Sequence, residues 1–439
     1  MTDAEFGTAD LLTSIVTLIM PIFSLTIYEA VFRYAMEKDY DKNAVFSTGL
    51  IVSFIGAGVL CATGGIISAV RPVQYIWLVI LYSIAGFLRS LFSQYTRAIE
   101  KSVLFTVDNI LLTVFVFIFN ITFLSGLKLG VSGYLLGYAL ANVFSCLFLF
   151  IFLGKKNRGF SMKGVTNKLV KEMLLFAIPL IPNSVCWWIS SFIDRLVITS
   201  VEGEAANGIY AAAHKIPSLL TMIVTIFFQA WQISANQEFN KKDISKFYSE
   251  IHSFLFSTIT LISSLLIALC KPITSVFLGK DFYSAWKLIP LMLFGMTCFS
   301  FAMFLGSIYS ANKKTAMALV TNVVAVVISL SVNLLLVGYF KIGIIGSAIA
   351  LCCSYFVFWL VRVFNTEKIV KINYPVLKMV IAMSLLLADA IIYSFCNDSI
   401  IVYSFAGITS TAIAAMFFRE YIALCKFGFS LIRKLFGRK

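Results

Sequence analysis

The stretch AVFSTGLIVSFIGAGVLCATGGIISAV (44–70) decides the fold class, because its 27 residues include no Lys, Arg, Asp or Glu. About 20 apolar residues in a helix are enough to cross the hydrocarbon of a bilayer. Similar runs recur along all 439 residues of the chain, which is 60% hydrophobic and only 13% charged. A soluble domain of this length needs more polar surface than that. The sequence therefore predicts an all-α polytopic membrane protein.

The apolar runs divide into thirteen candidate spans, and basic residues gather in every second connection between them. The spans lie at about 8–34, 44–70, 73–93, 103–124, 131–153, 173–200, 205–235, 247–270, 284–310, 315–337, 342–363, 376–396 and 399–418. One set of connections (33–42, 97–101, 155–171, 241–246, 313–314, 362–371 and 419–439) carries 25 Lys and Arg residues. The alternate set carries five, namely Arg71, Lys128, Lys271, Lys280 and Lys341. The positive-inside rule places the first set, and with it the C-terminus, in the cytoplasm.

Matched motifs at nearly constant spacing indicate a duplicated unit of about six helices. Lys128 in KLGVSGYLLG can be aligned with Lys341 in KIGIIGSAIA, and Tyr95 with Tyr309. Parallel repeats of this kind are one way to build a transporter. We therefore expect an N-terminal lobe, a basic cytoplasmic loop, a C-terminal lobe, two extra helices and a basic amphipathic tail. Their expected limits are 1–154, 155–172, 173–368, 369–420 and 421–439.

Ionisable residues at bilayer depth cost several kcal/mol unless they are paired or hydrated, so each one needs a reason. Glu29 and Arg33 are four residues apart, which favours an ion pair on one helix face that can also line a polar cavity. Arg89 and Asp108 on neighbouring spans predict a structural ion pair. Asp389, in the span at 376–396, has no evident partner.

The spans at 173–200 and 205–235 carry the other candidate site residues. Asp194 and Arg195 are adjacent and point about 100° apart on a helix, so one can pair sideways while the other faces a cavity. Lys215 follows His214 and precedes Pro217, which should kink the helix. We interpret Lys215 as facing an anionic substrate, whereas His214 can be a packing residue. Gln229, Gln232 and Asn236 form a polar stripe that suits either a hydrated pathway or a hydrogen-bonded helix seam.

Signatures of catalysis and cofactor binding are missing from the sequence. It has no Walker A loop, no GxSxG elbow and no Cys/His cluster of metal-ligand spacing. The nine cysteines mostly lie singly in apolar runs and read as small core residues. The sequence therefore predicts neither an enzyme nor a protein that holds a metal or cofactor.

Three segments together resemble the polysaccharide-transporter (Wzx-type) flippases of the MOP superfamily. They are GTADLLTSIVTLIMPIFSLTIYEAVFRY (7–34), NSVCWWISSFIDRLVIT (183–199) and NGIYAAAHKIPSLLTMIVTIFFQAWQISAN (207–236). The resemblance runs through the whole chain. It implies a MOP/MATE-like fold with two six-helix lobes around a central cavity and two extra C-terminal helices. The positions matching a cationic cavity are Arg33, Arg195 and Lys215, with Glu29 and Asp194 as partners.

The resemblance further implies a function and a location. Such flippases translocate undecaprenyl-pyrophosphate-linked oligosaccharide repeat units across the cytoplasmic (inner) membrane of bacteria for surface polysaccharide biosynthesis, by alternating access. The expected partners are this lipid-linked substrate, the lipid bilayer and a polysaccharide polymerase or other assembly proteins. The protein is expected to be a monomer with no nucleic-acid partner, since its net charge of +14 sits mostly in cytoplasmic connections.

Two other classes of function remain as alternatives. One is a multidrug or cation exporter of the same superfamily, which would favour acidic residues in the cavity. The other is a membrane polysaccharide polymerase or ligase, which would need a large outside loop with catalytic residues. The resemblance also implies fourteen helices with both termini in the cytoplasm. We therefore expect one further helix ahead of Met1, owing to a start codon assigned too far downstream or a truncated gene.

Overall fold

The computed structural model describes residues 3–37, 39–71, 73–154, 164–238, 243–277, 280–396 and 398–422. Within these ranges all regular secondary structure is helical. Eleven helices there are long and apolar enough to cross a membrane, and the bent pair Leu11–Phe23 and Ile27–Ala35 makes a twelfth candidate. The shorter apolar helix Ile400–Met416 occupies the place of the thirteenth predicted span. The structure confirms the prediction of an all-α, multi-pass membrane protein.

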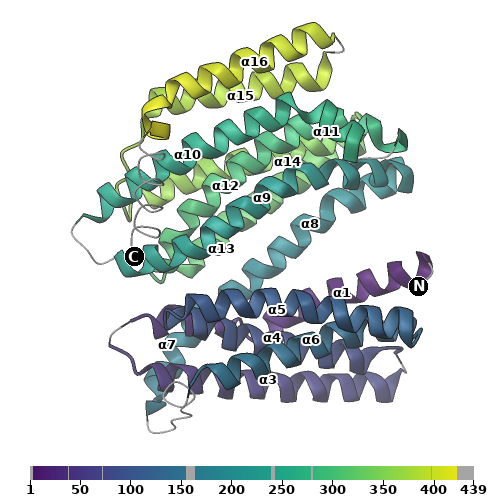
Figure 1. Ribbon diagram of the computed structural model, residues 1–439, viewed down its shortest axis with the longest axis vertical. Coiled ribbons are helices and arrows are strands. Elements are labelled where there is room, and N and C mark those ends of the chain that lie inside the picture. Colours follow the sequence, from purple (N-terminus) through teal and green to yellow (C-terminus); the bar gives the residue numbers. More distant parts are fainter. Residues whose placement is uncertain are drawn as a thin grey trace, which may run out of the picture. The chain divides into compact units, whose positions relative to one another are not determined.

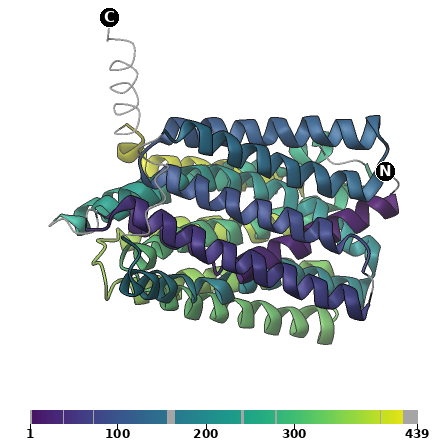
Figure 2. The ribbon, with the colours of Figure 1, turned by 90° about the horizontal axis from the view of Figure 1, so that it is seen from below.

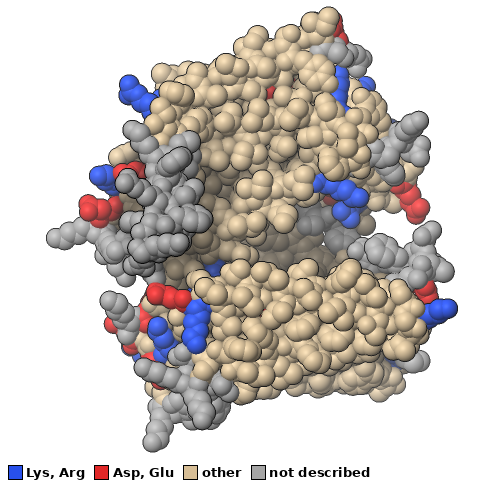
Figure 3. Space-filling model, in the orientation of Figure 1, with Lys and Arg blue, Asp and Glu red and all other residues tan. Residues whose placement is uncertain are grey.

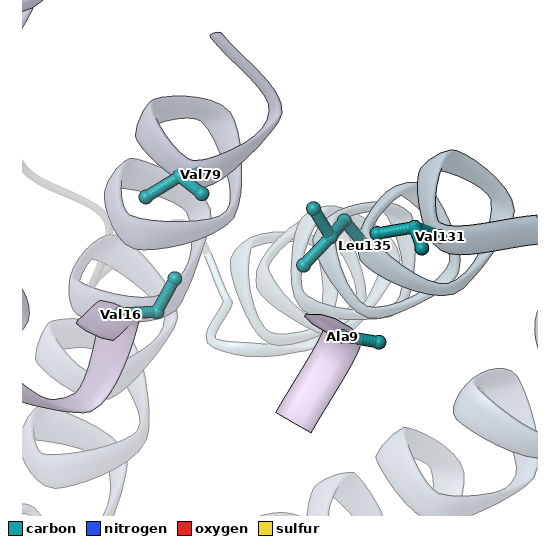
Figure 4. Close-up of a cluster of buried hydrophobic side chains, with 5 residues drawn as sticks. All are labelled: Ala9, Val16, Val79, Val131 and Leu135. Atoms are coloured by element: carbon teal, nitrogen blue, oxygen red, sulfur yellow. The ribbon is translucent and has the colours of Figure 1, made fainter. Parts of the chain in front are cut away.

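The chain forms two compact units, of which unit 1 comprises Met1–Trp188 and Lys313–Leu319. Its helices run lengthwise beside one another (Figures 1 and 2). A core cluster of Ala9, Val16, Val79, Val131 and Leu135 joins the first helix to two later ones (Figure 4). The elements are α1 (Asp3–Phe23), α2 (Ile27–Ala35), α3 (Lys42–Val70), α4 (Ile76–Ala98), α5 (Ser102–Asn120), a π-helix (Ile121–Gly126), α6 (Gly130–Phe152), α7 (Asn167–Ala177) and the first part of α8 (Leu180–Glu202).

Unit 2 comprises Ile189–Asn312 and Val320–Lys439. Its central helix is α12 (Ile289–Ala311), which is almost entirely buried. The helices that pack around α12 are α9 (Glu204–Glu238), α10 (Ile244–Ala268), α14 (Ile344–Thr366) and α15 (Val376–Phe395). The other elements are the rest of α8, α11 (Cys270–Phe277), a 3-10 helix η4 (Lys280–Lys287), α13 (Thr315–Asn333, whose first turn lies in unit 1), a π-helix (Leu334–Tyr339) and α16 (Ser399–Met416).

The predicted repeat is visible as equal element lengths at a constant offset. The helices α4 and α12 both have 23 residues, and α5 and α13 both have 19. Each of the latter two continues directly into a six-residue π-helix. After it, Lys128 and Lys341 both adopt the left-handed conformation, with φ of 54° and 51°. The aligned lysines therefore mark the same turn in the two copies.

The surface agrees with a lipid environment. On the face shown in Figure 3, most of the surface along the helices of each unit is tan, and most Lys, Arg, Asp and Glu lie toward the helix ends; the exceptions on the upper unit are a small red spot and a group of blue side chains. Large apolar side chains such as Ile66, Val103, Phe117 and Met222 are exposed. Exposed apolar surface of this extent suits hydrocarbon rather than water.

Candidate substrate-binding site

The first span is broken, and the break sets the position of Glu29 and Arg33. The helices α1 and α2 meet at a 57° bend. Leu25 and Thr26 take left-handed backbone angles there, with φ of 49° and 47°. The Thr26 hydroxyl donates a hydrogen bond of 2.7 Å to the Ala177 carbonyl, which anchors the bend to the end of α7. The nine residues of α2 therefore form an independently oriented helix that carries both charged side chains.

The predicted ion pair between Glu29 and Arg33 is replaced by other contacts. The Arg33 guanidinium pairs with Glu37, one turn beyond it, at 2.7 Å. Glu29 instead accepts a hydrogen bond of 3.4 Å from the Gln94 side chain on α4. The physical reason is that Gln94 engages the Glu29 carboxylate, so the carboxylate of the following turn satisfies Arg33. Glu37 also pairs with Lys313 at 2.9 Å, so it serves two cations.

Arg97 is a buried cation beside this cluster that the sequence reasoning placed in a connection. It lies in the last turn of α4 and is only 4% exposed. Its guanidinium sits 4.3 Å from the centre of the Phe32 ring and donates a hydrogen bond of 3.3 Å to the side-chain oxygen Oε1 of Gln94. Gln94 thus links Arg97 to Glu29. The three-residue spacing of Gln94 and Arg97 places them on one face of α4, but it does not reveal the contact with Glu29 on another helix.

The charged cluster around Arg33, Glu37 and Lys313 continues through Tyr34 and Tyr40. The Lys313 ammonium lies 4.2 Å from the Tyr34 ring centre, a cation–π contact. The Tyr40 hydroxyl donates a hydrogen bond of 2.7 Å to the Glu172 carboxylate. That hydrogen bond is the main cause that raises the pKa of Tyr40 above its ordinary value, so the phenol stays a donor. Arg33 therefore lies in a paired, largely buried environment.

In unit 2, Asp194 and Arg195 separate as adjacent helix positions should. Asp194 is 7% exposed and accepts a hydrogen bond of 2.8 Å from the Tyr210 hydroxyl on α9. It also accepts from the side chains of Ser329 and Asn333 on α13. Its carboxylate is therefore satisfied by neutral donors inside the unit. Arg195 is exposed on the next position of α8.

Lys215 is exposed on α9, and the Arg195 guanidinium lies within electrostatic range of the neighbouring His214 ring. Within the described residues, neither Arg195 nor Lys215 forms an ion pair with an acidic side chain. His214 is half-buried, with its ring centre 6.5 Å from that of Tyr210. The helix α9 continues through Pro217 without a break. The structure therefore presents two exposed cations from unit 2 that form no ion pair in the described chain.

The polar stripe on α9 is divided between exposed and buried positions. Gln229 is exposed, Gln232 is half-buried and Asn236 is buried. Trp231 lies among them, donates from its indole nitrogen to the Ser307 hydroxyl at 2.9 Å, and stacks on Phe304. This part of α9 therefore forms a packed seam with α12, while Gln229 stays accessible.

The predicted structural pair of Arg89 and Asp108 is confirmed, with 2.7 Å between the guanidinium and the carboxylate. In unit 2, the positions equivalent to this ion pair surround a guanidinium that comes from α14 rather than from α12, the counterpart of α4. Arg362 of α14 donates to the Ala302 carbonyl at 2.6 Å and to the Thr321 hydroxyl at 3.2 Å. The difference of 213 that aligns the two copies relates Ala302 to Arg89 and Thr321 to Asp108. The second copy therefore keeps the buried cation and lacks the carboxylate.

Comparison with known proteins gives consistent matches. Residues 1–232 match the family described as "Polysaccharide biosynthesis protein", and residues 179–335 match the family described as "MatE". No curated protein matches the chain.

Solved structures of MATE transporters share the fold. A mutant MATE transporter superposes with a TM-score of 0.70 at 15% identity, covering 88% of this chain and 89% of that one. An outward-facing multidrug resistance MATE family transporter of the MOP superfamily gives 0.70 at 14% identity, with 83% and 87% covered. A MOP superfamily transporter from Pyrococcus furiosus gives 0.69 at 12% identity, with 86% and 87% covered.

The polysaccharide match spans more than half of the 439 residues. Both matched families consist of transporters rather than enzymes, and the structural neighbours carry the same fold. The chain belongs to the polysaccharide biosynthesis protein family of the MOP superfamily, and it is a multi-pass membrane transporter.

Proposed function

We propose that this transporter is a flippase that moves polyprenyl-pyrophosphate-linked oligosaccharide repeat units across the bacterial cytoplasmic membrane by alternating access. The observation that carries the proposal is the exposure of Arg195 and Lys215 on two membrane helices, where neither forms an ion pair with an acidic side chain of the described chain. A cation at bilayer depth is costly to keep without a counter-ion, so an anionic substrate is its natural partner.

The chemistry of a lipid-linked sugar fits this arrangement. A pyrophosphate concentrates negative charge and cannot cross hydrocarbon without groups that replace its hydration. Arginine and lysine supply charge-assisted hydrogen bonds to phosphate oxygens. The polyprenyl tail remains in lipid, while Gln229 and neighbouring polar side chains can meet the sugar. We retain Arg33 as a further cationic contact, with Glu29, Asp194 and Gln232 as supporting residues.

One structural neighbour supports the idea that this fold accommodates substrates of different charge. The Pyrococcus furiosus transporter is described with the words "Reverse polarity of binding pocket suggests different function". By analogy, a chain with the fold of a multidrug exporter can have basic side chains in its binding pocket, where the exporter needs acidic ones.

A multidrug or cation exporter is the second candidate, favoured by the match of residues 179–335 to the MatE family. Such an exporter needs an accessible carboxylate for a cationic drug. Asp194 is the acidic residue of unit 2 closest to the candidate cations, but it is buried and already accepts hydrogen bonds from Tyr210, Ser329 and Asn333. The arrangement of charges therefore favours an anionic substrate.

Paired genetic assays separate the two candidates. Expression of the protein in a strain that lacks its own oligosaccharide flippase is expected to restore surface polysaccharide, measured by immunoblot of the polymer. Expression in a strain without multidrug pumps is expected to leave resistance to ethidium unchanged. The opposite pattern, with raised ethidium resistance and no polymer from any repeat unit tried, would reject the flippase proposal.

Charge asymmetry also predicts the topology, with the 155–171 connection and the C-terminus in the cytoplasm. Lys163 and the segment 421–439 are relevant here, although Lys163 and residues 423–439 lie outside the described residues. Single cysteines at positions 163 and 280, in a background without accessible thiols, should react oppositely with a membrane-impermeant maleimide in intact cells. We expect labelling at 280 only. Labelling at 163 from outside would contradict the assignment.

A further inference from the structure

Asp389 is a buried acidic side chain that the proposed transport site does not use. It lies in the C-terminal half of α15 and is fully buried. Neither of its carboxyl oxygens has a hydrogen-bond partner among the described residues. The elements that pack against α15 are α10, α12, α16 and the 3-10 helix η4. An ionised carboxylate in such surroundings would forfeit its hydration without compensation.

A basic side chain beside this end of α15 is held by other groups. Lys271, the second residue of α11, places its ammonium 4.3 Å from the Trp286 ring centre and 5.6 Å from that of Tyr393, a residue of α15. The same ammonium lies 5.9 Å from the Tyr403 ring centre. Lys271 is thus engaged by an aromatic cage and forms no ion pair with Asp389 in the described structure.

We propose that Asp389 is a reversible proton-binding site of unit 2. In the arrangement observed here the carboxyl group carries the proton and is neutral. When water reaches it, the O–H bond breaks, the electron pair stays on the carboxylate oxygen and the proton passes to a water molecule, after which the Lys271 ammonium can pair with the carboxylate. The reaction exchanges one proton with the solvent and needs no other reactant.

A proton fits this site better than a metal ion. Hard cations such as Na⁺ or Ca²⁺ need several oxygen ligands arranged around them. No group of three or more His, Cys, Asp or Glu side chains with metal-binding geometry occurs in the described part of the chain. A single carboxyl group with no oxygen partner can be neutralised by one proton.

The elements packed against this end of α15 carry other titratable residues, and they define the controls. They are Cys270 and Lys271 in α11, Tyr283 and Lys287 in η4, Tyr393 in α15 itself, Tyr403 in α16 and Cys298 in α12, while Lys280 and Asp281 of η4 lie outside the described side chains. The C-terminal half of α10, residues 257–268, contains no ionisable side chain. Among the described side chains of these elements near this end of α15, Asp389 is the acidic one, and Asp281 of η4 lies outside the described side chains.

A role of this proton in transport rests on the proposed function. The binding of the proton to Asp389 does not depend on that function. Exchange of a proton at a site that is dry in one arrangement and wet in another would link translocation to the pH gradient. The cage would then release Lys271 toward the carboxylate in the wet arrangement.

Infrared difference spectroscopy of the purified full chain in nanodiscs tests proton binding directly. Spectra are recorded between about pH 5 and about pH 9 and subtracted from one another. A protonated carboxylic acid gives a C=O stretching band that an ionised carboxylate lacks. We expect a band that shifts in D₂O, persists at pH values at which an ordinary aspartate is ionised, and is lost in Asp389→Asn. Asp389→Glu should restore a displaced band, which guards against a folding defect in the first variant.

Asp398→Asn is the matched control, because Asp398 is an exposed acid nine positions along that caps α16 by accepting hydrogen bonds from the backbone of Ile400 and Ile401. Its loss should leave the band unchanged. The absence of any band in the wild-type protein, or its persistence in Asp389→Asn, would overturn the proposal. A flippase assay that fails while the band behaves as expected would reject the proposed function and leave the proton site standing.

Discussion

Replacing both Arg195 and Lys215 with alanine is expected to abolish restoration of surface polysaccharide in a flippase-deficient strain. Each side chain would lose a charge-assisted contact to pyrophosphate worth about 1.5–3 kcal/mol, and 1.4 kcal/mol corresponds to a factor of ten. Each single variant should therefore lower the rate of translocation about 10- to 100-fold. The measurement is the amount of polymer made at matched membrane abundance of the protein.

The conservative variants make this prediction specific. Lys215→Arg keeps the charge and should retain most activity. Arg195→Lys should fall between wild type and Arg195→Ala if the guanidinium binds phosphate through two nitrogens, because lysine offers only a point charge. Lys378→Ala is the matched control, since Lys378 is a partly exposed lysine on a membrane helix that pairs with Glu420 at 3.2 Å. Normal polymer from the Arg195→Ala and Lys215→Ala double variant would reject the role of both residues.

The fold could be predicted from sequence because its main signals are local. The length of an apolar run sets the span, and the alignment of Lys128 with Lys341 follows from a duplicated turn that the structure reproduces in both copies. The break between α1 and α2 was missed, since Pro21 lies inside α1 and the bend depends on left-handed angles at Leu25 and Thr26. Those angles are stabilised by a contact with Ala177, which is remote in sequence.

The candidate site was predictable only in part. The separation of Asp194 from Arg195 follows from helix geometry, and the pairing of Arg89 with Asp108 follows from the cost of unpaired charges in a bilayer. The partner of Arg33 did not follow, because Glu29 and Glu37 are equally spaced from it. The choice is made by Gln94 on another helix, whose contact with Glu29 no sequence spacing reveals. Arg97 was missed for the same reason.

Removing the Asp108 carboxylate is expected to be the most destabilising single change in unit 1. Asp108 is fully buried, pairs with Arg89 at 2.7 Å and accepts a hydrogen bond from the Ser145 hydroxyl. Breaking a buried pair from one side leaves an uncompensated charge, which costs about 3–5 kcal/mol. Asp108→Ala should therefore lose this amount in unfolding free energy, measured by titration with SDS in mixed micelles.

The repeat supplies a control from within the same chain. The Arg89→Met and Asp108→Leu double variant should be more stable than Asp108→Ala, because neither charge then remains unpaired. In unit 2, Arg362 occupies the equivalent location with only the neutral partners Thr321, Asn322 and the Ala302 carbonyl among its hydrogen bonds. Thr321→Asp places a carboxylate where unit 1 has Asp108 and should be more stable than Thr321→Asn by about 1 kcal/mol or more. Equal stability of those two variants, together with an Asp108→Ala loss below about 1 kcal/mol, would show that burial of the guanidinium does not depend on a counter-ion in either copy.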